Sequence, residues 1–90
     1  MNTKLKELCK EYLNLQGKIY LCESFVSSDV AKVAANFYTL GSAQRAMYGV
    51  MFKIAAAGYV QMNQLEELIE EYKNECKNQG TDPTVGIAVS

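Results

Sequence analysis

The chain has 90 residues, which is enough for one small domain, because most domains hold about 100–150 residues. Its composition, 49% hydrophobic and 21% charged, is typical of a folded domain and excludes a disordered chain. The formal net charge of -1 gives no general attraction to nucleic acid.

The first predicted helix begins at Asn2 or Thr3, whose side chains can cap free backbone N–H groups, and runs to about Ser24. Gly17 lies on its polar side, where glycine indicates either the close approach of another helix or a kink. Spacings of three and four place one apolar stripe along the helix. The stripe consists of Leu5, Leu8, Tyr12, Leu15, Ile19, Cys22 and Val26.

A second helix is predicted to start after the cap residues Ser27, Ser28 and Asp29. Gly41 and Ser42 could end one helix and cap another, which would give four helices in total. The apolar stripe stays in phase across this point, which favours one long helix to about Ala57. The stripe consists of Val30, Val33, Phe37, Leu40, Gln44, Met47, Met51 and Ile54.

A third helix is predicted between two glycines, with Gly58 capping the helix before it and Gly80 ending it. It starts near Asn63, ends near Asn78, and its stripe is Met62, Leu65, Ile69, Tyr72 and Cys76. The fold class is therefore a small all-α antiparallel bundle of three helices, or four if Gly41 breaks the second, over residues 1–80.

The last ten residues, 81–90, form a separate tail in this prediction. Pro83 excludes a helix at its start, and alternating apolar residues after it indicate an extended segment. If the tail docks on the bundle, Val85, Ile87 and Val89 are the residues expected to make the contact.

The side of the second helix opposite its stripe carries small residues and almost no charge. A helix face in contact with water normally carries polar or charged residues, so this face is expected to be covered. Its edge holds aromatic residues and one arginine at intervals of seven: Tyr38, Arg45, Phe52 and Tyr59. Small residues beside them permit close helix approach: Ala35, Ser42, Ala46, Gly49 and Ala56.

Two interpretations explain such a face. In the first, a second copy covers it, because small residues, aromatics and arginine suit a buried interface. In the second, the other two helices and the tail wrap around it inside a monomer. The first is favoured, since helices in a monomeric bundle usually leave one side in water. It predicts a homodimer or higher homo-oligomer that binds a protein partner as a regulator, inhibitor or adaptor.

A different function class, a small-ligand binding or sequestering protein, remains as the alternative. Arg45, the only arginine, and Tyr48 could enclose an anionic or nucleotide-like molecule at a subunit interface. Arg45 could equally extend into solvent from an apolar surface.

Other chemistry finds little support in the chain. It has no histidine, its three cysteines form no CxxC pair, and no nucleophile or phosphate-loop motif occurs, so no enzyme, metal or cofactor is predicted. The glutamates of the third helix indicate a solvated face, or one that meets a basic partner.

Direct nucleic-acid binding is not favoured either, because the lysines are scattered among glutamates. The longest apolar run, residues 46–60, is interrupted by Lys53 and too short to span a membrane. Unpaired cysteines and the lack of a secretory leader predict a cytoplasmic location.

Overall fold

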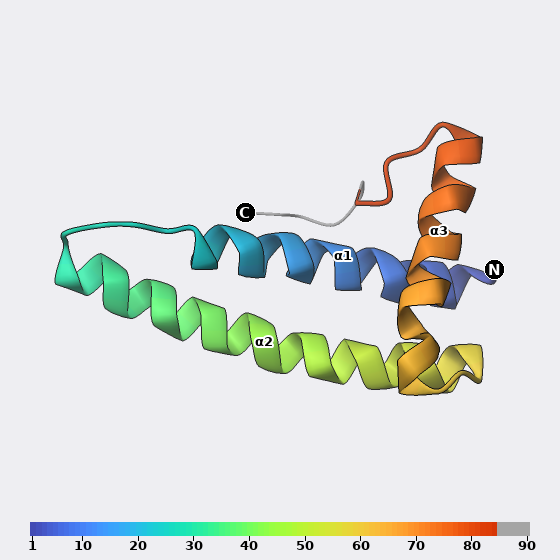
Figure 1. The fold of residues 1–90 in the computed structure, drawn as a ribbon, viewed down its shortest axis with the longest axis horizontal. Coiled ribbons are helices and arrows are strands. Elements are labelled where there is room, and N and C mark those ends of the chain that lie inside the picture. Colours follow the sequence, from blue (N-terminus) through green and yellow to red (C-terminus); the bar gives the residue numbers. More distant parts are fainter. Residues whose placement is uncertain (85–90) are drawn as a thin grey trace.

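The computed structural model describes residues 1–84 and is all-α over that part of the chain. Its elements are α1 (Thr3–Glu23), α2 (Val30–Gly58), the 3-10 turn η1 (Met62–Gln64) and α3 (Leu65–Gln79). Helices α1 and α2 run antiparallel and side by side, and α3 crosses them at the end where the N-terminus lies (Figure 1). The prediction of a small all-α bundle with three main helices is confirmed.

Local capping explains where the helices start. The Asn2 side-chain oxygen accepts a hydrogen bond from the Leu5 N–H at 2.8 Å, and Asp29 accepts one from Ala31 N–H at 3.0 Å. Both bonds satisfy N–H groups that the first turn of a helix leaves unpaired. Helix α2 continues through Gly41 without a break, as the in-phase stripe predicted.

The predicted cap at Gly58 is wrong. Gly58 is the last helical residue of α2, and Tyr59 takes the left-handed conformation instead, with φ 52°. A Cβ on Gly58 would lie 2.9 Å from Cδ2 of Leu68, so this glycine permits the close approach of α3 to α2. Tyr59 therefore turns the chain at a conformational cost of about 1–2 kcal/mol for an L-residue.

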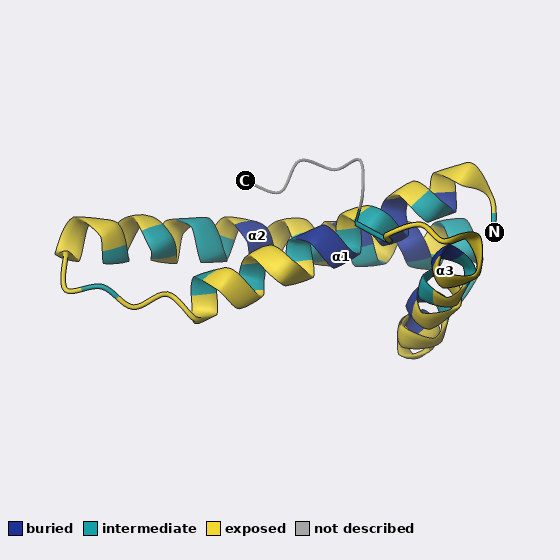
Figure 2. Ribbon diagram, turned by 90° about the horizontal axis from the view of Figure 1, so that it is seen from above, coloured by how far each residue is buried: buried dark blue, intermediate teal, exposed yellow. Residues whose placement is uncertain are grey.

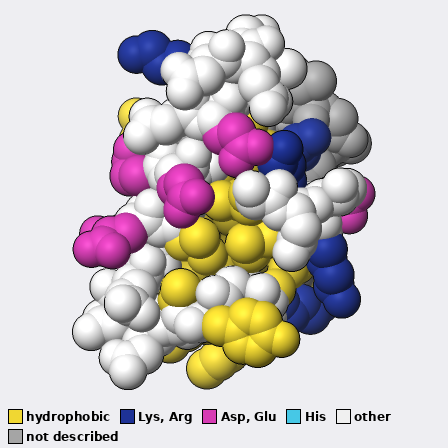
Figure 3. Space-filling view, turned by 90° about the vertical axis from the view of Figure 1, so that its right-hand side faces the viewer, with side chains coloured by type: hydrophobic (Ala, Val, Ile, Leu, Met, Phe, Trp, Pro, Cys, Tyr) yellow, Lys and Arg dark blue, Asp and Glu magenta, His cyan; other side chains and the backbone are white. Residues whose placement is uncertain are grey.

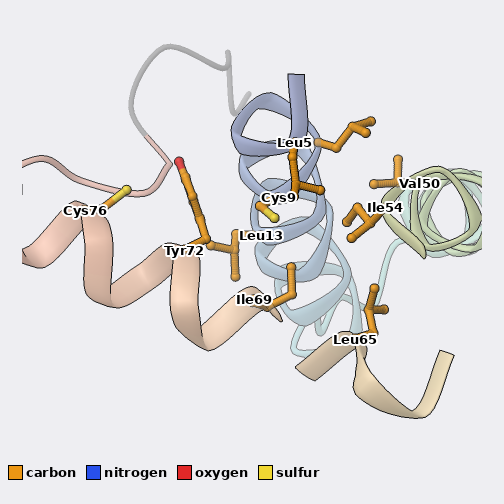
Figure 4. Close-up of a cluster of buried hydrophobic side chains, with 10 residues drawn as sticks. Leu5, Cys9, Leu13, Val50, Ile54, Leu65, Ile69, Tyr72 and Cys76 are labelled. Atoms are coloured by element: carbon orange, nitrogen blue, oxygen red, sulfur yellow. The ribbon is translucent and has the colours of Figure 1, made fainter. Parts of the chain in front are cut away.

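The core lies where α3 crosses the α1–α2 pair (Figure 4). Leu5, Val50 and Ile54 lie between α1 and α2, whereas Leu13 and Tyr72 lie between α1 and α3. Ile54 and Cys9 are completely buried, at 0% exposure. The core cluster consists of Leu5, Leu8, Cys9, Leu13, Val50, Ile54, Leu65, Ile69, Tyr72 and Cys76.

Burial corrects parts of the predicted stripes. On α1, Cys9 and Leu13 are buried although they lie beside the stripe, because α3 covers a second side of α1 here. On α2, Phe37 and Gln44 are exposed, and Ala43 and Val50 are buried in their place. The stripe of α3 is buried except for its first member, Met62.

Away from α3, the α1–α2 pair continues as a two-helix hairpin with little cover (Figure 2). The whole molecule measures 44 × 28 × 17 Å, and its radius of gyration of 14.7 Å exceeds the roughly 12 Å of a compact domain of this length. The Asn36 side chain donates a hydrogen bond to the Cys22 carbonyl at 2.8 Å and ties the two helices together there. This end has no third layer among the described residues.

Residues 81–84 pack back onto the helices. The Tyr72 hydroxyl donates a hydrogen bond to the Pro83 carbonyl at 2.9 Å, and Asp82 accepts one from the Thr84 N–H at 2.8 Å. The predicted contacts of Val85, Ile87 and Val89 lie outside the described residues.

All three cysteines are free thiols, with Cys9 and Cys76 buried and Cys22 half-buried. Burial raises the pKa of Cys9 to about 11, with smaller contributions from Glu71 and Cys76. Cys9 is therefore an inert core side chain at neutral pH. Within residues 1–84, no helix combines the length and the apolar character that crossing a bilayer requires.

Candidate functional site

The candidate site is the side of α2 that points away from α1, and we call it the outer face. All nine predicted members are exposed, so α1, α3 and residues 81–84 leave this face uncovered. The interpretation of a wrapped monomer therefore finds no support among the described residues. The outer face consists of Ala35, Tyr38, Ser42, Arg45, Ala46, Gly49, Phe52, Ala56 and Tyr59.

Three aromatic side chains form a ridge along the outer face. Tyr38 is 76% exposed, Phe52 is 64% exposed and Tyr59 is 96% exposed. They lie at positions 38, 52 and 59, with Arg45 at the intervening interval of seven, so Tyr38, Arg45 and Phe52 follow one line along the helix with a drift of about 20° per repeat, and Tyr59 lies just past the helix end. Aromatic side chains that share one exposed line are typical of an interaction surface.

A line of small residues runs beside the ridge, also at intervals of seven. Ala35, Gly49 and Ala56 each precede a member of the ridge by three positions, and Ser42 precedes Arg45 by three. A Cβ on Gly49 would meet nothing within 4 Å, so the backbone is open to an approaching surface at this point. Large and small side chains thus make a ridge and a shallow trough on one face.

Charge on α2 is sparse and of one sign. The helix holds Lys32, Arg45 and Lys53 and no acidic residue. The ion pairs among the described residues involve α1, α3 and the N-terminus, and none includes Arg45. The Arg45 guanidinium lies back over Gly41, with one nitrogen 3.5 Å from the position a Cβ there would occupy.

The structure does not strengthen the ligand-binding alternative at Arg45 and Tyr48. Four surface hollows lined by described residues lie on α3, at the open end of the hairpin, and between α1 and α3. None of these four includes Arg45 or Tyr48. Both residues are exposed on α2 without an enclosing wall.

A second surface, the acidic face of α3, borders the core end of the molecule. Figure 3 shows several acidic side chains gathered on the left of this end, bordering a patch of hydrophobic side chains, with most of the visible basic side chains on the right. An open hollow on α3 is lined by Glu66, Glu67, Glu70, Glu71, Asn74, Glu75 and Asn78. In residues 1–84 no group of three acidic or cysteine side chains is arranged to hold a metal ion.

Two of these carboxylates are paired within the chain. Glu75 lies 2.6 Å from the Lys6 ammonium and 3.8 Å from the N-terminal ammonium, and Glu70 lies 3.3 Å from Lys73. Glu75 therefore fastens the start of α1 to α3. The remaining glutamates of the face, Glu66, Glu67 and Glu71, make no ion pair within residues 1–84 and are exposed.

Replacing Glu75 by glutamine is expected to destabilise the fold in a pH-dependent way. The hydrogen bond from Lys6 is the main cause that lowers the pKa of Glu75 below its ordinary value of 4.5. A carboxyl group whose pKa is lower in the folded state than in the unfolded state stabilises the fold at a pH above its unfolded-state pKa. This stabilisation is lost as the pH falls through the folded-state pKa. Urea unfolding should therefore show a deficit in E75Q near neutral pH that shrinks as pH falls below 4.5.

Glu71→Gln is the matched control, because Glu71 lies on the same helix without an ion pair in the structure. A deficit in E75Q that stayed constant from neutral to acid pH would show that the Lys6 pair is not its cause.

Sequence reasoning missed a further exposed apolar area at the open end of the hairpin. Val26, Val30 and Phe37 were assigned to core stripes, yet they are 92%, 81% and 66% exposed. Periodicity finds an apolar side of a helix but does not say whether another element covers it. The hollow at this end is lined by Cys22, Glu23, Phe25, Val26, Ser27, Val33, Asn36, Phe37 and Leu40.

Comparisons of the chain with protein-family models, curated proteins and solved structures found no match. The residues of this chain therefore carry the functional inference.

Proposed function

We propose that this is a non-enzymatic protein whose copies associate through the outer face of α2, and that the resulting dimer binds a protein partner as a regulator, inhibitor or adaptor. The observation that carries the proposal is the uncovered outer face, with three exposed aromatic residues and no acidic residue on its helix. The free, largely buried cysteines support a place in the reducing cytoplasm.

The exposed area suits an interface between two copies. Taking about 200 Å² for a fully exposed aromatic side chain, Tyr38, Phe52 and Tyr59 in two copies offer roughly 900–1,000 Å². Specific interfaces bury about 1,200–2,000 Å² in total. The six other residues of the outer face supply the remaining area. One helix face per copy is therefore sufficient for a specific interface.

The acidic face of α3 is the surface we assign to the protein partner. Glu66, Glu67 and Glu71 are exposed and unpaired within residues 1–84, so their charge is available to a basic surface. This face lies on a different helix from the outer face of α2, so both surfaces can be occupied together.

Gly49→Leu tests the proposal. A leucine at this position meets nothing inside one copy, and it should favour the helix by about 0.8 kcal/mol relative to glycine. In a dimer joined through the outer face, the added side chain instead fills the trough and separates the helices. We expect multi-angle light scattering to show a drop from dimer to monomer, with the helix content retained.

The matched control is Gly17→Leu. Gly17 is also a helical glycine whose Cβ would meet nothing within 4 Å, but it lies on α1. The G17L variant should gain the same helix propensity as G49L, and its measured mass should remain that of a dimer. Equal masses for the wild type, G49L and G17L would contradict an interface on the outer face.

A further inference from the structure

We infer that the two copies pair with their α2 helices antiparallel, about a two-fold axis at the level of Met47. This inference rests on the proposed function and adds the direction and register of the pairing. It follows from the way large and small residues alternate along the outer face.

The alternation is regular over the length of α2. Small residues at 35, 42, 49 and 56 and large residues at 38, 45, 52 and 59 divide the face into eight successive levels. Each level holds one residue that points outward, with spacings of three and four, as in the contact line of a coiled coil. A well-packed pairing must place a large side chain against a small one at each level.

A parallel two-fold pairing fails this requirement. It places each residue beside its own copy, so aromatic residues would meet aromatic residues and alanines would meet alanines. The helices would be held apart at Tyr38 and Phe52, with voids at Ser42 and Gly49. It would also place Arg45 beside Arg45 of the second copy, on helices without acidic residues to neutralise them.

The antiparallel pairing satisfies the requirement at every level. An axis at the level of Met47 places Gly49 opposite Arg45 of the second copy, and Ser42 opposite Phe52 of the second copy. The same axis places Ala56 opposite Tyr38 and Ala35 opposite Tyr59. All eight levels then combine one small and one large residue, and the two arginines occupy neighbouring levels, about 6 Å apart along the axis, in place of the same level.

The left-handed Tyr59 fits this register. It follows the last helical residue of α2 and is 96% exposed, so its side chain is available to a second copy. The antiparallel register gives it the small partner Ala35 near the start of the other helix. The contact between the two copies thus extends over the whole length from Ala35 to Tyr59.

Distances between spin labels test the direction of pairing. Lys32 and Gln44 are exposed on α2 and are not members of the outer face, so each can be replaced by a labelled cysteine. The background carries Cys22→Ser, because Cys9 and Cys76 are buried. With a rise of 1.5 Å per residue, the antiparallel register separates the two copies along the axis by about 45 Å at residue 32 and about 9 Å at residue 44.

We expect double electron–electron resonance to give a long distance for Lys32→Cys and a short one for Gln44→Cys. Short distances at both positions would overturn the antiparallel inference and leave the dimer standing. Long distances at both positions, in a sample with dimer mass, would overturn the register. Absence of coupling at both positions, with a monomer mass by sedimentation, would overturn the proposed function itself.

Discussion

Ile54→Ala is expected to be the most destabilising single substitution in the core. Ile54 is completely buried, and it packs where α2 meets the cluster that α1 and α3 share. Removing buried carbons from such a site costs about 2–5 kcal/mol, through lost transfer free energy and the cavity left behind. The free energy of unfolding of a domain of this length is about 5–13 kcal/mol in total, so the variant should lose a large part of its stability.

Urea unfolding followed by circular dichroism measures this loss as a fall in the midpoint of about 1–3 M. Leu21→Ala is the matched control, because it also removes three carbons, yet Leu21 is 62% exposed on α1. The control should change the free energy of unfolding by no more than about 0.5 kcal/mol. Equal midpoints for I54A and L21A would show that the core does not lie where α3 crosses the hairpin.

Phe52→Lys is expected to have the largest effect on association. Phe52 is the central aromatic residue of the outer face, and interface aromatics commonly cost about 2 kcal/mol or more when they are lost. Each dimer contains the position twice, so the dissociation constant should rise by roughly a thousandfold. The new lysine also joins Arg45 and Lys53 on a helix without acidic residues, which adds repulsion between the copies.

Sedimentation velocity checks this prediction at a concentration where the wild type is dimeric. Tyr20→Lys provides the control, since Tyr20 is 69% exposed on α1 and Phe52 is 64% exposed. F52K should sediment as a folded monomer with unchanged helix content, and Y20K should remain dimeric. A dimer of F52K with wild-type affinity would place the interface on another surface.

Helix ends could be predicted because the signals that set them are local. Asn2, Asp29 and Gly80 act within one turn of their own positions, and the structure uses all three. Gly58 shows the limit of such signals. Gly58 packs against the Leu68 side chain of the next helix, and Tyr59, not the glycine, takes the left-handed conformation.

Which side of each helix is buried was less predictable. Helix α3 has one apolar side, so its buried residues followed from spacing alone. Helix α2 is apolar on most sides, and several stripes of the same spacing fit its sequence. Which of them faces α1 depends on tertiary packing, and this is why Phe37 and Gln44 were misplaced.

The outer face itself could be located in the sequence because Arg45 is its only charged residue, and the structure exposes every one of its nine residues. The open end of the hairpin could not, because its exposure results from where α3 crosses. Spacing along the sequence does not specify that crossing point.

Sedimentation equilibrium of the unmodified protein over a range of concentrations tests the central claim most directly. An outer face buried between two copies predicts a mass of twice 10.0 kDa at high concentration, which decreases toward 10.0 kDa on dilution. A mass of 10.0 kDa at every concentration, up to the highest at which the protein stays in solution, would contradict it.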